Sequence, residues 1–186
     1  MKKQIRVIGI DDSSFNKFKD KKVLVIGTIY RGGDFIDGLV SCYVDKDGKD
    51  ATDKLIEMIN KCKFKPQLQY SFIDGIAVAG FNVIDVKKLS QKTKLPVIVV
   101  IRDYPDFEKI KKTLRYLRMK EKIKLIEKAG SVIKMNNIFV QLTNLDVEKA
   151  KQLLRITCTH SNIPEPLRVA HIIGSGIIKG ESRGKA

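Results

Sequence analysis

Residues 5–44 contain three apolar segments in succession with no helix between them, and this order limits the possible folds more than any other feature. Ile5 to Ile10 is almost continuously apolar and ends in two aspartates, which is typical of a central strand buried on both faces. Lys22 to Tyr30 and Phe35 to Val44 are predicted to be the next two strands, and the glycines between them suit a hairpin turn. A doubly wound nucleotide-binding fold would place a helix after its first strand. The P-loop and dinucleotide glycine patterns are also missing where such a fold requires them.

The remainder of the chain alternates predicted helices and strands. In chain order we predict a helix over residues 51–62, a strand over 69–73, a helix over 81–92, a strand over 97–101, long basic helical stretches over 106–128, short strands over 131–134 and 138–142, a helix over 146–160 and a partly helical tail over 164–179. An antiparallel meander followed by parallel crossover units gives an α/β fold with a mixed sheet and helices on both faces. The order strand, strand, strand, helix, strand, helix, strand is the ribonuclease-H-like order. We expect one domain over residues 1–186, with a loose C-terminal segment at 180–186.

Aspartates occupy the carboxyl ends of three of these predicted strands. The first and third strands run in the same direction and the strand over 69–73 is parallel to the first, so their carboxyl ends share one edge of the sheet. These ends carry Asp11 with Asp12, Asp45 and Asp74. Clustered carboxylates repel one another unless cations lie among them, and two Mg²⁺ or Mn²⁺ ions roughly 4 Å apart would also align an attacking water with a phosphate. We therefore predict that Asp11, Asp45 and Asp74 are the metal ligands and catalytic residues of a phosphodiester hydrolase.

Asp12 and Asp50 are secondary candidates for the same site. Successive strand residues face opposite sides of a sheet, so only one of Asp11 and Asp12 should point at the metal, and Asp11 directly continues the strand. Asp50 is close to the predicted helix over 51–62 and could reach the site, although a helix cap is an equally good interpretation. Asp37 shares the side-chain direction of Asp45 but precedes it by eight residues, roughly 25 Å of strand, and is excluded for that reason.

The chain is strongly basic, with 36 Lys and Arg against 21 Asp and Glu, a formal net charge of +15 and a pI near 9.7. Polyanions are the usual partners of such a charge, although a solvated lysine-rich surface is an equally ordinary interpretation. Arg102 follows the strand over 97–101 and is a candidate phosphate contact, with a neighbouring aspartate as the alternative partner. Lys109, Lys112 and Arg115 belong to a basic helical stretch that would follow a nucleic-acid backbone, with a solvated helical face as an equally ordinary interpretation. DNA is the predicted partner, RNA is the alternative, and the oligomeric state is left open.

The histidines and cysteines predict no further metal site. His160 and His171 are interpreted as core or helix-end residues, because no complementary pair completes a zinc site. The three cysteines are far apart and odd in number, which argues against disulfides and for a reducing cytoplasm. Neither a signal peptide nor a membrane span is expected, because the apolar runs are too short.

At these residues the chain resembles the archaeal family known as DUF99 or UPF0215 (endonuclease dU), which is related to endonuclease V. The matching segments are GIDDS (9–13), GTIYRGGDFIDG (27–38), VDKDGKDAT (44–52), DGIAVAGFNVID (74–85), LPVIVVIRDYPD (95–106) and EPLRVAHIIGSGIIKGESRGKA (165–186). This resemblance implies a ribonuclease-H-like fold and a divalent-metal endonuclease that acts on DNA with deaminated bases, deoxyuridine or deoxyinosine.

The resemblance also assigns individual residues. Asp11 matches the first-strand aspartate of endonuclease V, and Asp74 matches its later Asp-Gly aspartate. The glutamate of endonuclease V near the first helix has no Glu here, so Asp45 is the nearest candidate, with Asp50 behind it. Arg102 falls where endonuclease V carries a lysine. The proline-containing wedge of endonuclease V is not recognisable in this chain, and Ala79-Gly80-Phe81-Asn82 replaces its His-Pro-Arg stretch.

The alternative function is a non-catalytic nucleic-acid-binding module on the same fold. Such a module would bind nucleic acid in a strongly salt-dependent manner without a need for Mg²⁺. A small-molecule phosphotransferase is disfavoured, because the chain lacks a phosphate-binding glycine loop.

Overall fold

The computed structural model describes residues 4–182, and its central feature is a mixed sheet of seven strands in the order β3-β2-β1-β4-β7-β9-β8. These strands are β1 (Arg6–Asp12), β2 (Lys22–Arg31), β3 (Phe35–Asp45), β4 (Tyr70–Asp74), β7 (Val97–Ile101), β8 (Ile133–Met135) and β9 (Ile138–Thr143). The short strands β5 (Ala77–Val78) and β6 (Asn82–Val83) pair only with each other. The helices are α1 (Ala51–Lys61), the 3-10 turn η1 (Lys65–Gln67), α2 (Val86–Thr93), α3 (Phe107–Tyr116), α4 (Lys120–Lys128), α5 (Val147–Thr157) and α6 (Glu165–Lys179).

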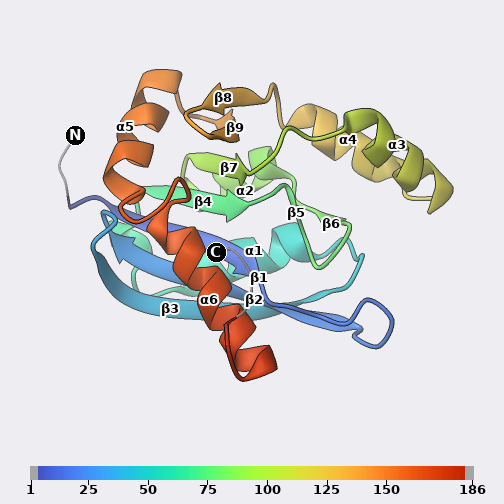
Figure 1. The fold of residues 1–186 in the computed structure, drawn as a ribbon, viewed down its shortest axis with the longest axis horizontal. Coiled ribbons are helices and arrows are strands. Elements are labelled where there is room, and N and C mark those ends of the chain that lie inside the picture. The colour runs from blue at the N-terminus through green and yellow to red at the C-terminus, as the bar shows by residue number, and fades with distance from the viewer. Residues whose placement is uncertain (1–3, 183–186) are drawn as a thin grey trace.

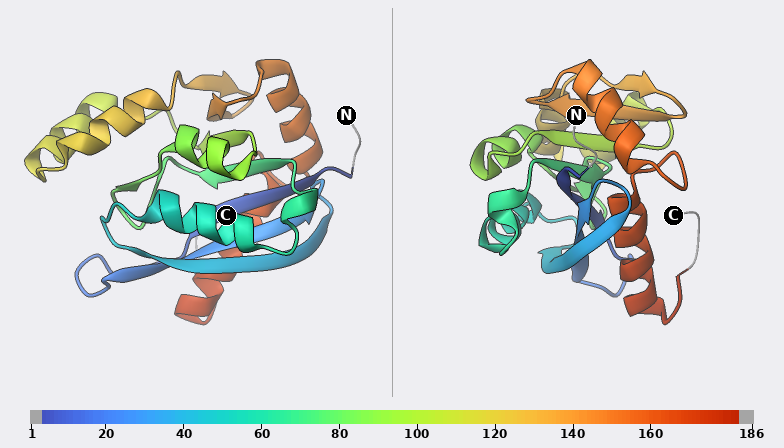
Figure 2. Two further views of the ribbon diagram at one scale, coloured as in Figure 1. Left: turned by 180° about the vertical axis from the view of Figure 1, so that it is seen from behind. Right: turned by 90° about the vertical axis from the view of Figure 1, so that its left-hand side faces the viewer.

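Helices cover both faces of the sheet (Figure 1 and Figure 2). On one face α1 and α2 bury Leu55, Ile59 and Leu89 completely against the sheet. On the other face α5 and α6 bury Leu153 and Leu167 in a second core. Burying two apolar layers on one sheet is the stable arrangement for such amphipathic elements. The predicted α/β fold with helices on both faces is therefore confirmed.

β1 lies inside the sheet, between β2 and β4, and both of its faces are apolar. Ile8 and Ile10 are buried on the α1 side and Val7 on the α6 side, all with no exposed surface. β1 pairs antiparallel with β2 and parallel with β4, and β4 pairs parallel with β7. The carboxyl ends of β1, β4 and β7 therefore share one edge of the sheet, as the strand order predicts.

The predicted helix over residues 81–92 is wrong in its first part. Residues 82–83 form β6, and α2 begins only at Val86. Asn82 is fully buried, where its side-chain amide donates to the carboxylate of Asp50 at 2.7 Å. Asp85 then caps the helix, because its carboxylate accepts a hydrogen bond from the backbone N–H of Lys88 at 3.0 Å. The apolar spacing of this segment matches a helix, but the buried asparagine commits its first residues to a tertiary hydrogen bond.

The later elements agree with the prediction more closely. The basic stretch over 106–128 forms α3 and α4, which are separated at Arg118, where φ is +57°. The tail over 164–179 forms one continuous helix, α6, which ends at Gly180 with φ of +77°. Residues 183–186 of the predicted loose segment lie outside the described part. Within residues 4–182 no helix is both long and apolar enough to cross a bilayer.

Two segments project past the carboxyl-terminal edge of the sheet (Figure 1 and Figure 2). One is the loop of residues 13–21 between β1 and β2, and the other is the hairpin of α3 and α4. Lys122, only 2% exposed, attaches this helical hairpin to the turn after β3 by donating from Nζ to the carbonyl oxygen of Asp47 at 2.6 Å. The carboxyl ends of β1, β4 and β7 lie between these two projections.

Candidate active site

An open cleft of about 770 Å³ lies at the carboxyl-terminal edge of β1. Asp11 and Asp12 reach it from β1, Asp74 from the end of β4, Arg102 from the residue after β7 and His171 from α6. The loop of residues 13–21 and the end of α6 form the remaining walls, with Ser13, Phe15, Asn16, Lys17, Asp20 and Lys179 among their lining residues. The cleft therefore combines four carboxylates, one imidazole and several cations.

The parallel pairing of β1 and β4 sets Asp11 beside Asp74. Ile10 is the register partner of Ile73, so the next residue on each strand stands at the same level of the sheet edge. The negative charge of Asp74 accordingly contributes to raising the pKa of Asp11. The predicted convergence of these two aspartates is present in the structure.

His171 reaches the cleft because α6 lies close to β1 and β2. Gly9 makes this approach possible, since a Cβ atom at position 9 would collide with the backbone of Pro166. Thr28 on β2 fixes the same turn of the helix by donating from Oγ1 to the carbonyl oxygen of Pro166 at 2.6 Å. With α6 in this position, Nδ1 of His171 lies 3.0 Å from Oδ2 of Asp11.

Asp11 is 5% exposed, and its surroundings shift its titration. Burial raises the pKa of Asp11 to about 6, the hydrogen bond with His171 opposes this rise, and the charges of Asp74 and Asp12 add to it. The hydrogen bond with Asp11 in turn raises the pKa of His171. The raised pKa of Asp11 lies in the range in which an acid–base or metal-binding group is useful.

Asp12 and Asp74 both have partners within the protein. Asp12 faces the other side of β1, where its Oδ2 accepts a hydrogen bond from the backbone N–H of Ala79 at 2.7 Å. Burial raises the pKa of Asp12. Oδ2 of Asp74 lies 2.9 Å from the Arg102 guanidinium, so Arg102 reaches the cleft by pairing with Asp74 rather than with Asp103 or Asp106.

Asp45 and Asp50 do not join this group, and neither lines the cleft. β3 is the outermost strand on its side of the sheet, and β2 separates it from β1. Asp45 is the register partner of Lys22 on β2, whereas Asp12 is the partner of Val25. Asp45 is therefore also displaced from Asp12 by three residues along β2. Asp50 holds the turn after β3, where its carboxylate accepts from the backbone N–H of Asp45 at 3.1 Å. The expectation that Asp45 lies beside Asp11 and Asp74 is therefore wrong, because strand direction alone does not give the lateral distance.

The basic residues of α3 lie apart from the cleft. Lys109, Lys112 and Arg115 are exposed on this helix and do not line the cavity. They lie on one of the two projections beside it.

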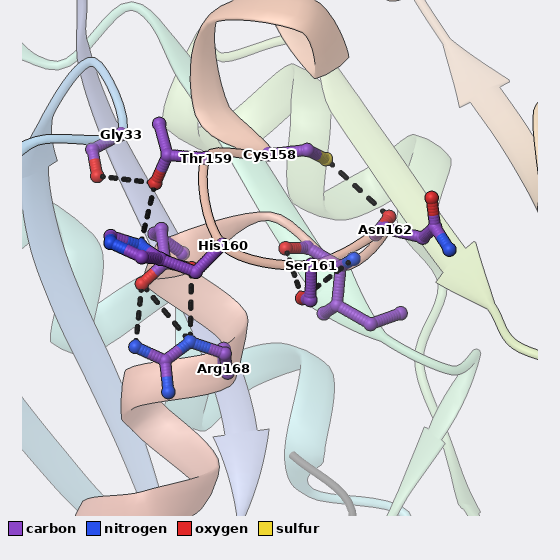
Figure 3. Close-up of polar contacts among 9 residues, drawn as sticks. Gly33, Cys158, Thr159, His160, Ser161, Asn162 and Arg168 are labelled. Atoms are coloured by element: carbon purple, nitrogen blue, oxygen red, sulfur yellow. Dashed lines mark hydrogen bonds and ion pairs between the residues drawn. The ribbon is translucent and has the colours of Figure 1, made fainter.

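The two histidines differ in position. His160 lies in the loop between α5 and α6, with Nδ1 2.9 Å from Oγ1 of Thr159 and 3.3 Å from Oε1 of Glu165 (Figure 3). Oγ1 of Thr159 donates to the carbonyl oxygen of Gly33 in the β2–β3 turn at 3.3 Å, and Arg168 binds the buried Glu165 at 2.8 Å. His160 thus lies in an exposed loop, so the expectation of a core or helix-end residue is wrong for it. His171 lies within α6 and lines the cleft, and the sequence offers no metal-ligand spacing that would have identified it.

The donor atoms of the cleft suit a hard divalent cation. Carboxylate oxygens are the preferred ligands of Mg²⁺ and Mn²⁺, and imidazole is an accepted addition. Across residues 4–182, no three His, Cys, Asp or Glu side chains are already arranged to hold one ion. A cation would have to compete with the Ala79 amide for Asp12 and with Arg102 for Asp74.

Comparison with known proteins shows the family. The model of the endonuclease dU family matches residues 3–178. The chain belongs to this family. A UPF0215 protein of Methanosarcina barkeri is 46% identical over 191 residues, which cover 100% of this chain and 97% of the relative.

Solved structures agree with this assignment. A protein of unknown function from Archaeoglobus fulgidus superposes with a TM-score of 0.88 at 38% identity, covering 94% of this chain and 99% of that one. Endonuclease V of Ciona intestinalis, solved with a DNA that contains inosine followed by a ribo-adenosine, superposes with a TM-score of 0.56 at 18% identity, covering 90% and 82%. The fold is therefore ribonuclease-H-like. Membership in the endonuclease dU family together with this fold supports a nuclease that binds nucleic acid.

Proposed function

We propose that this member of the endonuclease dU family is a divalent-metal-dependent endonuclease that hydrolyses phosphodiester bonds in DNA at or near deaminated bases, deoxyuridine or deoxyinosine. The observation that carries the proposal is the meeting of Asp11, Asp74 and His171 in one open cleft of a chain with a net charge of +15. Carboxylates gathered in a basic protein favour a bound cation and an anionic substrate together.

Each residue has a distinct task in this proposal. Asp11 and Asp74 are the metal ligands, and Mg²⁺ or Mn²⁺ would supply a Lewis acid for the phosphate and a more acidic water. The backbone N–H of Asp12, 2.8 Å from Oδ1 of Asp11, and the imidazole of His171 hold the Asp11 carboxylate in one orientation. Arg102, which neighbours Asp74, supplies positive charge for the phosphate.

An apolar pocket beside the cleft supports a role for an extruded base. It has a volume of about 180 Å³ and begins at Gly75, the residue that follows Asp74. Ile76, Phe81 and Phe107 are among its lining residues. A cavity of roughly 150 Å³ admits a benzene ring, so this pocket suits one flat ring system. Enzymes that act at damaged bases take the base out of the stack into such pockets, which is why we place the deaminated base here.

The test is cleavage of labelled DNA oligonucleotides that contain uracil, hypoxanthine or no lesion, in the presence of Mg²⁺, Mn²⁺ or EDTA. The wild-type chain is compared with Asp11→Asn and Asp74→Asn, which keep side-chain size but remove a carboxylate. Asp53→Asn is the matched control, because Asp53 is an exposed residue of α1 whose ion pair with Lys88 lies on the surface.

Lesion-dependent nicking that disappears with EDTA and in both cleft variants, but persists in Asp53→Asn, would support the proposal. Cleavage that survives in Asp11→Asn and Asp74→Asn would contradict the assignment of the ligands. Salt-dependent binding without nicking under any metal would favour a non-catalytic nucleic-acid-binding module instead.

A further inference from the structure

Phe18 is the large apolar side chain with the greatest exposure among the described residues, at 97% of its possible surface. It lies at the tip of the loop of residues 13–21, which continues directly from the two aspartates at the end of β1. A phenylalanine that packed onto the protein would gain the free energy of removing its ring from water. The exposed ring of Phe18 forgoes this free energy, and the conformation of the loop is one cause of its exposure.

The loop is held rigidly by its own hydrogen bonds. Oδ1 of Asn16 accepts from the backbone N–H of Phe18 at 2.9 Å and of Lys19 at 3.1 Å, and the backbone N–H of Asn16 donates to Asp20 at 2.7 Å. Nζ of Lys46, after β3, donates to the carbonyl oxygen of Lys17 at 2.6 Å. These contacts hold the turn in a conformation that leaves the ring of Phe18 in water.

The loop is also part of the cleft and is positively charged. Asn16, Lys17 and Asp20 line the same cavity as Asp11 and Asp74. Lys17, Lys19, Lys21 and Lys22 follow one another around the tip, and the only acidic residue of residues 13–22, Asp20, is bound to the Asn16 backbone. A flat apolar ring surrounded by lysines suits a partner that offers phosphates and flat bases together.

The opposite projection repeats this combination. Tyr116, at the end of α3, is 86% exposed and neighbours Arg115 and Arg118. A groove of about 320 Å³ connects the two projections, with Phe15, Lys17 and Lys46 on one side and Leu117 on the other. Since this groove shares Phe15 and Lys17 with the cleft, a strand that lies in the cleft can continue between the projections.

We infer that Phe18 stacks on an unpaired base of the DNA strand that occupies the cleft, and that the loop of residues 13–21 is a rigid single-strand-binding element. The inference rests on the proposed function for the identity of the strand. Each base stacked on an aromatic ring strengthens binding enough that truncating the ring to alanine weakens affinity about 5- to 150-fold.

Tryptophan fluorescence offers a direct test, because the chain contains no tryptophan. Phe18→Trp places the only indole at the tip of the loop. Phe35→Trp is the matched control, because Phe35 is 58% exposed and pairs with Arg31 at the opposite end of β2. Each variant is titrated with single-stranded DNA in EDTA, so that binding is measured without cleavage. We expect the emission of Phe18→Trp to be quenched on saturation and that of Phe35→Trp to stay unchanged.

Affinity measurements complete the test. Phe18→Ala should bind the oligonucleotide at least fivefold more weakly, Phe18→Tyr should bind like the wild type, and Phe35→Ala should do the same. The slope of log affinity against log salt should be unchanged in Phe18→Ala, because stacking releases no counterions, whereas Lys17→Gln with Lys19→Gln should reduce it. These readouts separate stacking from a loss of charge.

Three results would overturn the inference: unchanged emission of Phe18→Trp at saturation, wild-type affinity of Phe18→Ala, or equal quenching by polyglutamate, which would indicate an acidic protein partner. Failure of the proposed function looks different. If oligonucleotides quench Phe18→Trp but no metal supports nicking, the stacking stands and the endonuclease proposal falls. If nicking is present and Phe18→Ala alters neither binding nor cleavage, the endonuclease proposal stands and the stacking falls.

Discussion

Nδ1 of His171 lies 3.0 Å from Oδ2 of Asp11, so two residues 160 positions apart in the chain form one ionisable pair at the edge of the sheet. Burial raises the pKa of Asp11 to about 6, and the hydrogen bond with His171 is the largest influence that opposes this rise. Because metal ligands must be deprotonated to bind, this pair links the proposed metal site to pH.

The first prediction concerns metal affinity as a function of pH. Below pH 6 the Asp11 carboxyl carries a proton that a cation must displace, so the Mn²⁺ affinity should fall by up to about tenfold for each pH unit, whereas above pH 7 it should level off. Calorimetric titration of the wild-type chain with Mn²⁺ between pH 5 and pH 8 measures this. A pH-independent affinity across pH 5 to 6.5 would show that Asp11 is not a ligand.

Replacing His171 should shift the pH dependence of the Mn²⁺ affinity. Without the imidazole, the buried Asp11 loses the hydrogen bond that lowers its pKa, so in His171→Asn the acidic limb of Mn²⁺ binding should shift to higher pH. His160→Asn is the matched control, because His160 contacts Thr159 and Glu165 rather than the cleft. A shift in both variants, or in neither, would contradict a specific role of His171 at Asp11.

Asp45 is a metal ligand according to the sequence prediction, but the structure places it outside the cleft. Asp45→Asn should retain cleavage close to that of the wild type, since Asp45 does not line the cleft, whereas Asp74→Asn should lose at least two orders of magnitude. Initial rates on one lesion-containing oligonucleotide compare them. Equal loss in both variants would mean that the turn after β3 moves into the site when DNA binds.

The sequence predicts Asp11, Asp74 and Arg102 together because each follows a buried strand and the ends of parallel strands align. Asp45 fails the same reasoning because sequence patterns give the direction of a strand but not its lateral place, and β3 lies beyond β2. His171 could not be found by spacing. Its position depends on how closely α6 packs on β1, which is a property of the tertiary contact between Gly9 and Pro166.

Asp37 should stabilise the end of the sheet opposite the cleft. Its side chain is 6% exposed and binds Arg6 at 2.6 Å and Arg31 at 2.8 Å. Although burial raises the pKa of Asp37, the hydrogen bonds from Arg31 and Arg6 outweigh it and hold that pKa below its usual value. Asp37→Asn should therefore lower the free energy of unfolding at pH 7 by about 2 kcal/mol, the usual effect of losing hydrogen bonds to a charged group.

The stabilisation that Asp37 provides should decrease as the pH falls. A carboxyl whose pKa is lowered by folding contributes its full stabilisation above the unfolded value of about 3.9 and loses it as the pH falls through the folded value. Urea unfolding at pH 7 and pH 3 should thus show a smaller difference between wild type and Asp37→Asn at pH 3. Glu57→Gln, which breaks an exposed ion pair with Lys61, should leave the midpoint unchanged at both values. An equal difference at the two pH values would show that Asp37 acts through packing rather than charge.

The contact between β1 and α6 should affect both the stability of the fold and the position of His171 in the cleft. The variant Gly9→Ala tests both effects. The added methyl group would collide with the backbone of Pro166, which should lower the free energy of unfolding by roughly 1–3 kcal/mol and push α6 away from β1. His171 would then move away from Asp11, so cleavage should fall further than the loss of folded protein explains. Gly176→Ala is the matched control on the same helix, because a Cβ atom there meets nothing within 4 Å and alanine favours helix by up to about 1 kcal/mol. Urea unfolding and cleavage rates per folded molecule measure both effects. If Gly9→Ala is less stable yet keeps full activity per folded molecule, the distance between His171 and Asp11 does not matter for the reaction.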